Sequence, residues 1–342
     1  MKIQENIALA PLTTLGIGGP ARWFAEAASE AEIAEACAWA RAREVPLFVL
    51  GGGSNVLVSD TGFDGLVLHV ALQGMALEGD LLCAAAGEPW EHCVEQAAEA
   101  GLAGVECLAG IPGTVGGTPV QNVGAYGQEA ASVVERVHGF DRLAQQFVEF
   151  TNAECGFAYR RSRFNTTDRG RYVVVRVDYR LRRGGAPTLA YADLKAHFAG
   201  WKMMPSLAEV ADAVRGIRKN KGMLPVEDAP ECRSAGSFFK NPSVAPEVAE
   251  RAKQIAAGVA VRTFPADGGL VKIPAAWLIE QAGFSKGYAL GAAAISSRHT
   301  LALVNRGGAT AAEILALAEK IGAAVEARFG IRLEMEPERI GF

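Results

Sequence analysis

The chain has 342 residues, a length that suits two or three domains of about 150 residues each. Its 34 basic and 38 acidic side chains give a formal net charge of −4, which excludes a protein that coats nucleic acid or another polyanion. Half of the residues are hydrophobic and 21% are charged, so the chain is not disordered. No apolar run approaches the ~18 residues of a membrane span, and no hydrophobic signal region follows Met1. We therefore expect a soluble cytoplasmic protein without a nucleic-acid partner.

The cysteines and histidines are too scattered to form a recognisable metal site. No CxxC pair occurs, and none of the six cysteines lies near a histidine at the spacing of a zinc site. In a chain of this size such cysteines usually behave as small buried apolar side chains. We expect neither a structural metal nor a disulfide framework. The cysteines are Cys37, Cys83, Cys93, Cys107, Cys155 and Cys232.

Strand and helix patterns alternate in the first hundred residues. A short strand at 23–25 leads to Ser29 and Glu32, whose spacing is that of a capping box, and the helix that they start should end before residue 45. A second helix should run from Pro89 to about residue 100. This mixture of helices and strands favours an α+β fold over a doubly wound sheet. Short apolar runs predict strands at 47–50, 56–58, 66–70 and 81–84.

The pattern changes from strands to helices near residues 195–205, where we place a domain boundary. Strands are predicted before it at 147–151 and 172–179. The chain should end in a strand at 331–336, with Arg332, Glu334 and Glu336 on one face. We therefore divide the chain into residues 1–200 and 201–342. Helical periodicity predicts helices at 207–219, 246–257, 274–282 and 311–328.

Two glycine-rich loops are the first candidates for ligand binding. Residues 51–55 read Gly-Gly-Gly-Ser-Asn, and residues 111–127 hold so many Gly and Pro residues that no ordinary helix or strand would form. Consecutive backbone N–H groups in such loops can bind phosphate oxygens, although tight turns have the same composition. Neither loop carries a known nucleotide-binding fingerprint. The residues alone leave both interpretations open.

Charged and hydroxyl side chains supply further candidates. Arg160 follows Tyr159 in a polar stretch, where a guanidinium can clamp a carboxylate. A basic cluster at 215–221 could attract an anionic substrate, or it could be a solvated helix face. Ser237 has neither the histidine base nor the elbow motif of a nucleophile, so it is either a proton donor to a basic carbanion or a turn residue.

Six segments follow one another along the chain at 50–55, 111–127, 159–160, 191–194, 236–242 and 278–281. Each alone is weakly specific. Together, with flanking matches from about Thr13 to Gly341, they resemble the family of UDP-N-acetylenolpyruvoylglucosamine reductases, flavoenzymes of peptidoglycan precursor synthesis. The intact segment around Tyr191 resembles the subtype whose tyrosine loop covers the substrate.

The resemblance implies a two-part FAD-binding region of the vanillyl-alcohol-oxidase type, at about 1–70 and 71–200, followed by a smaller α+β substrate-binding domain. This fold holds FAD without a Rossmann fingerprint, and the FAD would be bound noncovalently. Both glycine-rich loops would lie along its pyrophosphate. The implied FAD-binding residues are Gly51, Gly52, Gly53, Ser54, Asn55, Ile111, Gly113, Thr114, Gly116, Gly117, Gln121, Asn122, Gly124, Ala125 and Tyr126.

The implied reaction is an NADPH-driven reduction of UDP-N-acetylenolpyruvoylglucosamine to UDP-N-acetylmuramate. NADPH reduces FAD, and hydride then passes to the terminal methylene carbon of the enolpyruvyl group. Arg160 matches the residue that stabilises the charge developing on the substrate carboxylate, and Ser237 matches the proton donor that quenches the enolate. Ungapped alignment of the C-terminal segment selects Glu336 as the third catalytic residue. Because Pro337 is displaced from the family pattern, Glu338 is the alternative if a bulge shifts the register.

Further residues match positions that hold the UDP-sugar or its diphosphate. The match at Lys221 departs from the pattern because Gly222-Met223 is inserted after it, and Ser285 is an extra residue before Lys286. We expect a monomer whose partners are this substrate and NADPH. The implied substrate-binding residues are Tyr159, Tyr191, Lys221, Asn241, Gln281 and Lys286.

Two other functions remain as rivals. A related FAD oxidase acting on another substrate would ignore NADPH, and Ser237 with the C-terminal glutamate argues against it. A noncatalytic protein that binds flavin or a UDP-sugar would show binding without turnover. NADPH consumption that depends on the enolpyruvyl substrate would distinguish the expected enzyme from both.

Overall fold

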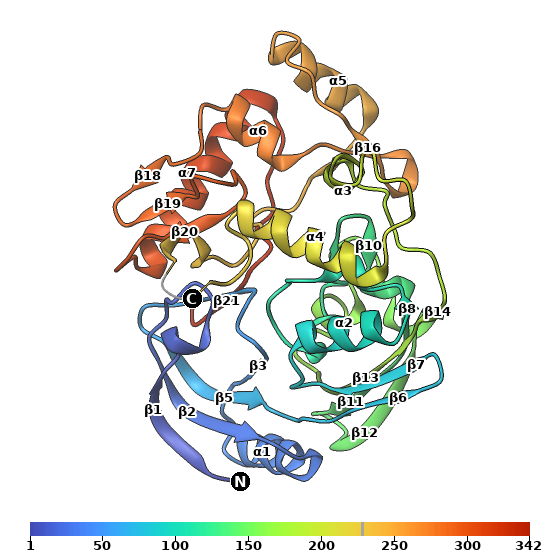
Figure 1. The fold of residues 1–342 in the computed structure, drawn as a ribbon. Coiled ribbons are helices and arrows are strands. Elements are labelled where there is room, and N and C mark those ends of the chain that lie inside the picture. Colours follow the sequence, from blue (N-terminus) through green and yellow to red (C-terminus); the bar gives the residue numbers. More distant parts are fainter. Residues whose placement is uncertain (227–228) are drawn as a thin grey trace. The chain divides into compact units, whose positions relative to one another are not determined.

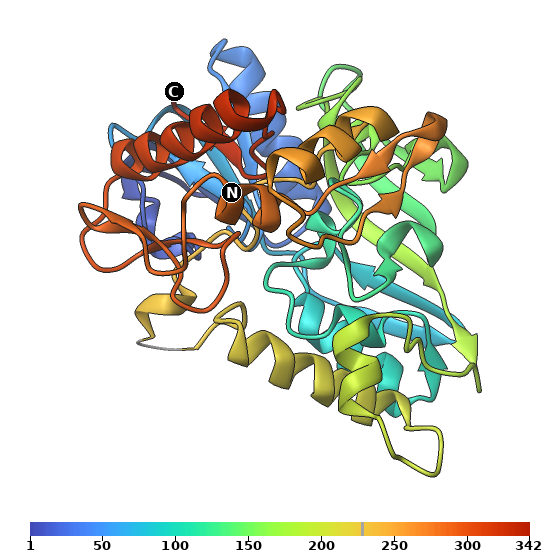
Figure 2. The same cartoon turned by 90° about the horizontal axis from the view of Figure 1, so that it is seen from above.

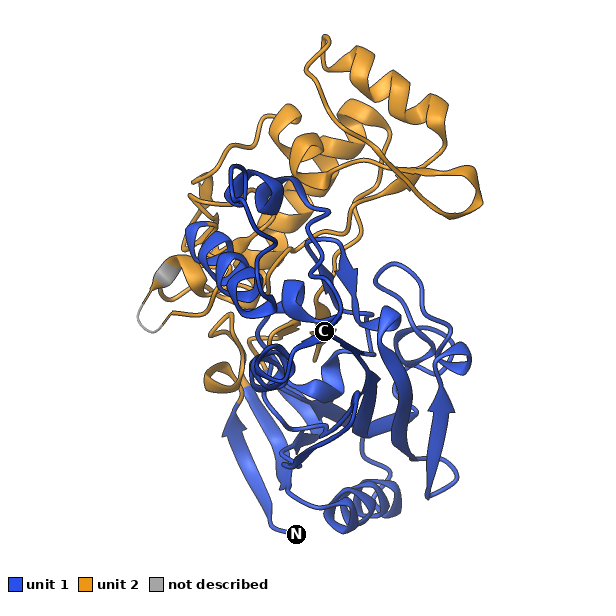
Figure 3. Cartoon of the chain, turned by 45° about the vertical axis from the view of Figure 1, so that its right-hand side comes forward, with its two compact units in different colours: residues 1–8, 20–53, 62–220 blue, residues 9–19, 54–61, 221–342 orange. Residues whose placement is uncertain are grey.

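A computed structural model describes residues 1–226 and 229–342 of the chain (Figure 1). The chain forms two compact units, and each is built from segments that are separate in the sequence (Figure 3). Unit 1 contains Met1–Ala8, Pro20–Gly53 and Gly62–Asn220. Unit 2 contains Leu9–Gly19, Ser54–Thr61 and Lys221–Phe342. The functional division at residue 200 stays a prediction, because these units are defined by packing and not by ligands.

The first sheet of unit 1 has the strand order β1-β2-β5-β3. Strand β1 is antiparallel to β2, and β2, β5 and β3 run parallel. Helix α1 (Glu30–Ala42) packs against this sheet, and its predicted capping box is confirmed, since Ser29 Oγ accepts from Glu32 N and Glu32 Oε2 accepts from Ala28 N. The strands are β1 (Ile3–Ala8), β2 (Pro20–Ala27), β3 (Leu47–Leu50) and β5 (Phe63–Val70).

The second sheet of unit 1 is antiparallel, with the order β12-β11-β13-β7-β6. Helices α2 (Trp90–Glu99) and α4 (Leu207–Asn220) lie side by side above it in Figure 1, and α3 (Ala192–His197) packs against α4. A buried apolar cluster joins the sheet to these helices. The strands are β6 (Met75–Glu78), β7 (Leu81–Ala85), β11 (Val134–Asp141), β12 (Gln146–Thr151) and β13 (Tyr172–Arg180), with the short pairs β8 (Leu102–Ala103) with β14 (Arg182–Arg183) and β9 (Gly124–Ala125) with β10 (Gln128–Glu129).

Unit 2 is organised around the long helix α7 (Ala311–Phe329), the red helix of Figure 2. A capping box between Thr310 and Glu313 begins the helix, and Gly330 with a φ of 67° ends it. The buried face of α7 packs with α6 (Ala275–Gln281) and the small sheet β18-β19-β20. The remaining elements are α5 (Pro246–Ile255), β4 (Val56–Val58), β15 (Ser243–Val244), β16 (Phe264–Pro265), β17 (Val271–Lys272), β18 (Ala289–Leu290), β19 (Ala293–Ile295), β20 (Leu303–Asn305) and β21 (Glu338–Ile340).

The predicted α+β class and the six predicted helices are confirmed. Strand β11 was not predicted, although it lies between β12 and β13. Its sequence Val-Glu-Arg-Val-His-Gly-Phe-Asp mixes charged residues and a glycine into the strand, so no clean alternation marks it.

The predicted C-terminal strand at 331–336 is wrong. Only Met335 pairs there, through an isolated antiparallel bridge to Phe239, and the regular strand β21 begins two residues after Glu336. Pro337 has no N–H to donate to a ladder, which separates the two pairings. Arg332 and Glu334 are exposed as expected, whereas Glu336 is half-buried.

Candidate active site

The two glycine-rich loops touch each other within unit 1. A Cβ atom on Gly52 would lie 2.6 Å from Gly113 Cα, and one on Gly51 would lie 2.9 Å from Thr114 Oγ1. A side chain at either position would therefore collide with the other loop. The first loop follows directly from strand β3, whose parallel pairing with β5 fixes its direction. Glycine is required here because two backbones approach one another.

Polar groups line the meeting point of these loops. Thr114 Oγ1 is shielded from solvent and has no hydrogen-bond partner among the described residues. Thr118, at the end of the same turn, is anchored to the sheet by a 2.6 Å hydrogen bond between its hydroxyl and that of Tyr179. A buried polar atom without a partner at the edge of a glycine cradle fits a bound diphosphate oxygen. The residues present thus fit the pyrophosphate of FAD.

The first loop continues into unit 2 at Ser54 and Asn55, where it is bonded to segments far away in the sequence. Thr14 Oγ1 donates a 2.7 Å hydrogen bond to the Ser234 carbonyl and lies 3.4 Å from the Ser54 carbonyl. Asn55 Nδ2 donates to the Glu336 carbonyl over 3.3 Å. The Asn55 carbonyl accepts from the N–H of Glu338 over 2.9 Å. Nothing in the sequence pattern singles out Thr14, which therefore escaped prediction.

The Arg160 guanidinium is held by the second glycine-rich loop. Nη2 donates to the Gly124 carbonyl over 2.6 Å, and Nη1 lies 3.4 Å from the Asn122 carbonyl. The guanidinium carbon also lies 5.3 Å from the centre of the Tyr159 ring. A Cβ on Gly124 would approach Nη1 to 3.0 Å, so a small residue is needed there. The cation is therefore fixed in position by the loop that the sequence assigns to FAD.

Three candidate residues of unit 1 have left-handed backbone conformations without being glycine. The φ angles are 47° at Asn122, 47° at Tyr126 and 55° at Arg160. Such a conformation costs an L-residue about 1–2 kcal/mol. Tyr126 with Gly127 forms the two-residue turn between β9 and β10, a turn type that requires positive φ at both positions. Non-glycine residues in such strained positions concentrate at functional sites.

Ser237 and Glu336 lie on paired segments within unit 2. The Glu336 N–H donates to the Phe238 carbonyl over 2.9 Å, and the Lys240 N–H donates to the Glu334 carbonyl over 2.9 Å. Phe238 and Phe239 are fully buried, so the backbone on the C-terminal side of Ser237 is locked. The Ser237 hydroxyl is half-exposed and makes no hydrogen bond to another described residue. Glu338 lies instead on β21, beside Val56 of β4.

The predicted substrate-binding residues divide between the units. Tyr159 and Tyr191 belong to unit 1, and the Tyr191 ring packs edge-on against Tyr126 with 5.2 Å between ring centres. Asn241 Oδ1 accepts from the first N–H of α6, whereas Gln281 ends that helix. At 1.5 Å per residue these two positions are about 9 Å apart along the axis. Lys221, after α4, is half-buried, and Lys286, beyond α6, is exposed.

The remaining FAD candidates lie along the second loop of unit 1. Gly116 packs closely, since a Cβ there would lie 2.8 Å from the Cβ of Ala86. The exposed Gly117 and the half-buried Gln121 flank the start of the turn, and Ala125 belongs to β9. Together the described structure brings Gly51–Gly53 and Ile111–Tyr126 into one part of unit 1, and Ser54, Asn55, Ser237 and Glu336 into one part of unit 2.

The arginines of the basic cluster at 215–221 lie in different surroundings. Arg215 pairs with Glu91 of α2 and with Asp212, whereas Arg218 is 7% exposed and donates to the Gly110 carbonyl over 2.8 Å. The alternative of a solvated helix face is therefore wrong for Arg218. Spacing alone does not reveal which face of a helix is covered, so the sequence left open whether this cluster attracts an anionic substrate or faces solvent.

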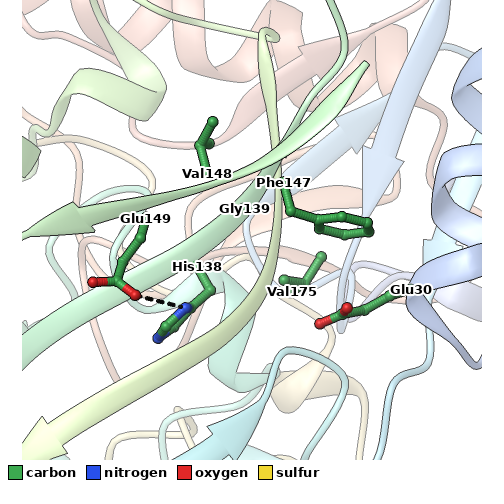
Figure 4. Close-up of a pocket in the computed structure, with 7 residues that line it drawn as sticks. All are labelled: Glu30, His138, Gly139, Phe147, Val148, Glu149 and Val175. Atoms are coloured by element: carbon green, nitrogen blue, oxygen red, sulfur yellow. Dashed lines mark ion pairs between the residues drawn. The ribbon is translucent and has the colours of Figure 1, made fainter. Parts of the chain in front are cut away.

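The described cavities do not coincide with these residues. One of about 330 Å³ opens on the second sheet of unit 1, between Phe147 and Glu30 on one side and the ion pair of His138 with Glu149 on the other (Figure 4). A second, of about 330 Å³, lies beside α4 next to Phe198 and Trp201.

The described residues contain neither a candidate membrane span nor a candidate metal site. No helix in residues 1–226 or 229–342 is both long and apolar enough to cross a membrane. Within the same ranges, no three histidine, cysteine, aspartate or glutamate side chains are grouped so that they could hold a metal ion.

Comparison with known proteins identifies both parts of the chain. Residues 21–144 match the model of an FAD binding domain, and residues 225–340 match that of the UDP-N-acetylenolpyruvoylglucosamine reductase C-terminal domain. The UDP-N-acetylenolpyruvoylglucosamine reductase of Streptomyces coelicolor is 45% identical over 99% of this chain and 91% of its own length. The enzyme of the same name from Pseudomonas putida is 40% identical over 98% of both chains.

A solved structure agrees with these relatives. The crystal structure of UDP-N-acetylenolpyruvylglucosamine reductase from Thermus caldophilus is similar with a TM-score of 0.70 and 29% sequence identity, covering 99% of each chain. The predicted resemblance and the predicted FAD-binding fold are thereby confirmed. The chain belongs to the family of UDP-N-acetylenolpyruvoylglucosamine reductases, which are FAD-dependent oxidoreductases.

Proposed function

We propose that the chain reduces the enolpyruvyl ether of UDP-N-acetylenolpyruvoylglucosamine to the lactyl ether of UDP-N-acetylmuramate, with Arg160, Ser237 and Glu336 as its catalytic residues. When bound, FAD supplies the redox chemistry, taking hydride from NADPH and passing it to the methylene carbon of the substrate. The chain must then stabilise negative charge beside the substrate carboxylate and deliver one proton to the adjacent carbon. We assign the first requirement to Arg160 and the second to Ser237.

Arg160 supplies the positive charge for the substrate carboxylate. As hydride arrives, electron density spreads into that carboxylate, so a cation already fixed nearby stabilises the developing charge more than the ground state. The hydrogen bonds to the Gly124 and Asn122 carbonyls support this role, because they hold the guanidinium still. A preorganised donor of this kind contributes about 3 kcal/mol to the transition state.

Ser237 donates the proton that completes the reduction. An enolate carbon is basic enough to take a proton from an ordinary alcohol, so no lowered serine pKa is required. The absence of any hydrogen bond from its hydroxyl to other described residues leaves the Ser237 proton available. This availability, on a backbone locked by Phe238, is the observation that carries the proposal.

Glu336 is the carboxylate of this site in preference to Glu338. The direct backbone hydrogen bond from Glu336 to Phe238 supports the choice, because it holds Glu336 beside the residue that follows Ser237. Glu338 pairs instead with Val56 on strand β4. A register shift is therefore not needed to bring a glutamate next to the serine segment.

Six residues hold the substrate. Tyr159 and Tyr191 contact it, and Lys221, Asn241, Gln281 and Lys286 hold the UDP-sugar and its diphosphate. The fifteen FAD-binding residues named above hold the cofactor. Residues 1–200, in two parts divided near residue 70, form the FAD-binding region, and residues 201–342 form the substrate domain.

The enzyme works as a monomer in the cytoplasm. Each of its six cysteines is free, which fits a reducing compartment. Its cosubstrate NADPH is also an intracellular metabolite. Sedimentation or light scattering of the purified holoenzyme tests the monomer, and a stable dimer contradicts it.

The decisive experiment follows the flavin absorbance under anaerobic conditions. Purified protein should be yellow, should bleach when NADPH is added, and should recover its colour when UDP-N-acetylenolpyruvoylglucosamine follows. Bleaching without recovery would favour the noncatalytic alternative or a different substrate. A yellow protein that NADPH does not bleach would favour the FAD oxidase.

A further inference from the structure

The structure buries a cation that the proposed reaction does not use. Arg218 occupies a core position of α4, in register with Leu207, Val210, Ala211 and Val214, which all face the interior of unit 1. A leucine or methionine would continue this apolar face. An arginine there is unusual, because taking a charge out of water costs several kcal/mol.

The first contact of Arg218 is with the backbone at the start of the second glycine-rich loop. Its Nε donates to the Gly110 carbonyl over 2.8 Å, and the Gly110 N–H donates to Oε2 of Glu91. Glu91 in turn pairs with Arg215. The peptide groups on both sides of Gly110 are thus gripped by α2 and α4, immediately before Ile111.

The second contact of Arg218 is with the phenol of Tyr126. A side-chain hydrogen bond joins the two groups. Tyr126 is 8% exposed, its φ is 47°, and its ring packs edge-on against that of Tyr191, 5.2 Å away. The guanidinium therefore reaches from the beginning of the glycine-rich loop to its far end, where the loop meets the tyrosine segment.

The electrostatics of Arg218 argue against a purely structural role. Burial lowers the pKa of its guanidinium, whereas Tyr126 and Glu91 act to raise it. Glu91 also pairs with Arg215 and accepts a hydrogen bond from the Gly110 N–H. An apolar core residue would pack here without the desolvation cost, which points to a requirement for the planar donor itself.

We propose that Arg218 is a positioning residue that ties Gly110, at the entrance of the FAD loop, to the Tyr126–Tyr191 pair, so that the flavin site and the substrate-facing tyrosine hold one geometry. The inference rests on the proposed function only through the role of Tyr191 in binding substrate. Arg218 touches neither reacting group and acts through the two segments that it joins. Loss of its donors should therefore weaken binding of both ligands.

Binding measurements on three single variants test the inference. Arg218→Met keeps the volume and removes every donor, Tyr126→Phe removes only the phenol oxygen, and Arg215→Met is the matched control one turn earlier on α4. FAD affinity is measured by fluorescence quenching on reconstitution of the apoprotein. Substrate affinity is measured from the absorbance change of the oxidised holoenzyme. Melting temperatures are recorded for each.

We expect Arg218→Met to raise the dissociation constants of FAD and of UDP-N-acetylenolpyruvoylglucosamine about tenfold each, the effect of one lost hydrogen bond to a charged group. Tyr126→Phe should weaken substrate binding and, because Tyr126 is also one of the proposed FAD-binding residues, should weaken FAD binding no more than Arg218→Met does. Arg215→Met should leave substrate affinity unchanged. In the double variant Arg218→Met/Tyr126→Phe, the substrate effect should not exceed that of Arg218→Met, because both remove the same connection.

Several outcomes would overturn the inference. A lower melting temperature for Arg218→Met with both affinities unchanged would leave only a structural role. Multiplicative effects in the double variant would mean that the two residues act independently. If Arg218→Met does not fold, Arg218→Lys and Tyr126→Phe decide. Lysine is a point charge without the planar fork of arginine. We therefore expect Arg218→Lys to have the wild-type melting temperature but a weakened substrate affinity. Wild-type substrate affinity in Arg218→Lys would contradict the inference.

The inference and the proposed function fail in different ways. If the proposed function is wrong, the wild-type holoenzyme itself will not bind UDP-N-acetylenolpyruvoylglucosamine. If only the role of Arg218 is wrong, wild-type binding is normal and the variants match it. The flavin affinity of Arg218→Met tests the Gly110 contact in either case.

Discussion

The Arg160 turn of unit 1 and the Ser237 segment of unit 2 are built in opposite ways. Arg160 has a left-handed backbone, and its guanidinium is bonded to two carbonyls. Ser237 lies beside a regular antiparallel pairing, and its hydroxyl is bonded to no other described residue. A group that only supplies charge benefits from being fixed, whereas a group that gives up its proton must not be held by another acceptor.

The two regions are also made rigid in different ways. Around Arg160 the polar contacts go to backbone carbonyls of the glycine-rich loop, at the cost of an unfavourable φ. Around Ser237 two buried phenylalanines fix the backbone, and the hydroxyl itself stays half-exposed. Substitutions in the two regions should therefore slow the same half-reaction, reduction of the substrate, to different degrees.

Removing the proton donor should have the largest effect. Ser237→Ala should slow reoxidation of the reduced flavin by substrate about 10³-fold, as expected for loss of general acid catalysis, and should leave reduction by NADPH nearly unchanged. Anaerobic stopped-flow absorbance measures the two half-reactions separately. Ser234→Ala, in the same segment, is the control and should retain both rates. Equal losses in both half-reactions would remove Ser237 from the chemistry.

Replacing the fixed cation should come next. Arg160→Lys keeps the charge but loses the fork that spans two carbonyls, so the rate of substrate reduction should fall about 10²-fold. The exposed neighbour Arg161→Lys should behave as wild type. A fully active Arg160→Lys variant would show that the reaction does not need a fixed guanidinium. The proposed difference between a fixed cation at Arg160 and an unbonded hydroxyl at Ser237 would then be wrong.

Substitution of the two C-terminal glutamates tests which of them acts together with Ser237. Glu336→Gln should lower turnover at least tenfold, an estimate at the low end for acid–base groups, whereas Glu338→Gln should change it little. The reason is that Glu336 is bonded to the serine segment and Glu338 to β4. Steady-state kcat of the two variants tests this directly. The reverse order would move the role to Glu338.

A substrate contact away from both regions should affect binding more than turnover. Lys221→Ala should raise KM for the UDP-substrate about tenfold with a smaller change in kcat, the result expected when a phosphate contact is lost. Lys219→Ala, two residues earlier, tests whether positive charge alone is responsible. An unchanged KM for Lys221→Ala would exclude it as a contact of the diphosphate or nucleotide.

A substitution far from either region should alter stability without altering chemistry. Asp141 is 2% exposed and accepts hydrogen bonds from Arg171 Nε and Nη2 and from two backbone N–H groups. The hydrogen bond from Arg171 holds the pKa of this carboxyl below its usual value, although burial opposes the shift. Asp141→Asn should lower the melting temperature at pH 7 by about 4 °C with kcat unchanged.

The pH dependence of that difference has a definite sign. Because the folded-state pKa of Asp141 is lowered, its stabilisation is present above the unfolded-state pKa and is lost as pH falls through the folded value. The gap between wild type and Asp141→Asn should therefore shrink below about pH 4. Scanning calorimetry between pH 3 and pH 8 measures it, with the exposed Asp212→Asn as control. A gap that widens in acid would contradict the assignment.

Much of the fold could be predicted from local pattern. The capping boxes and apolar periodicity located α1 and α7 correctly, because those signals act within one helix. Strand β11 was missed because its pairing partners, and not its own alternation, stabilise it. The strand expected at 331–336 failed because Pro337 interrupts the ladder, which propensity does not record.

The site was predictable in its residues but not in its arrangement. The glycines and Ser237 were found by composition and resemblance, yet nothing local indicates that Arg160 or Tyr126 would take a positive φ. Arg218 was read as part of a basic cluster, since its burial depends on α2 and the Gly110 loop. Thr14 was not found at all, because its two carbonyl contacts lie 40 and 220 residues away.

The route of the chain between the two units restricts how this enzyme can be dissected. The polypeptide passes from one unit to the other after residues 8, 19, 53, 61 and 220. A fragment ending at Asn220 would therefore keep Leu15, Ile17 and Leu57 without the apolar core that covers them, and would leave β4 without β21. Such a piece should aggregate when expressed, so the nucleotide-binding half is better studied by point substitution than by truncation.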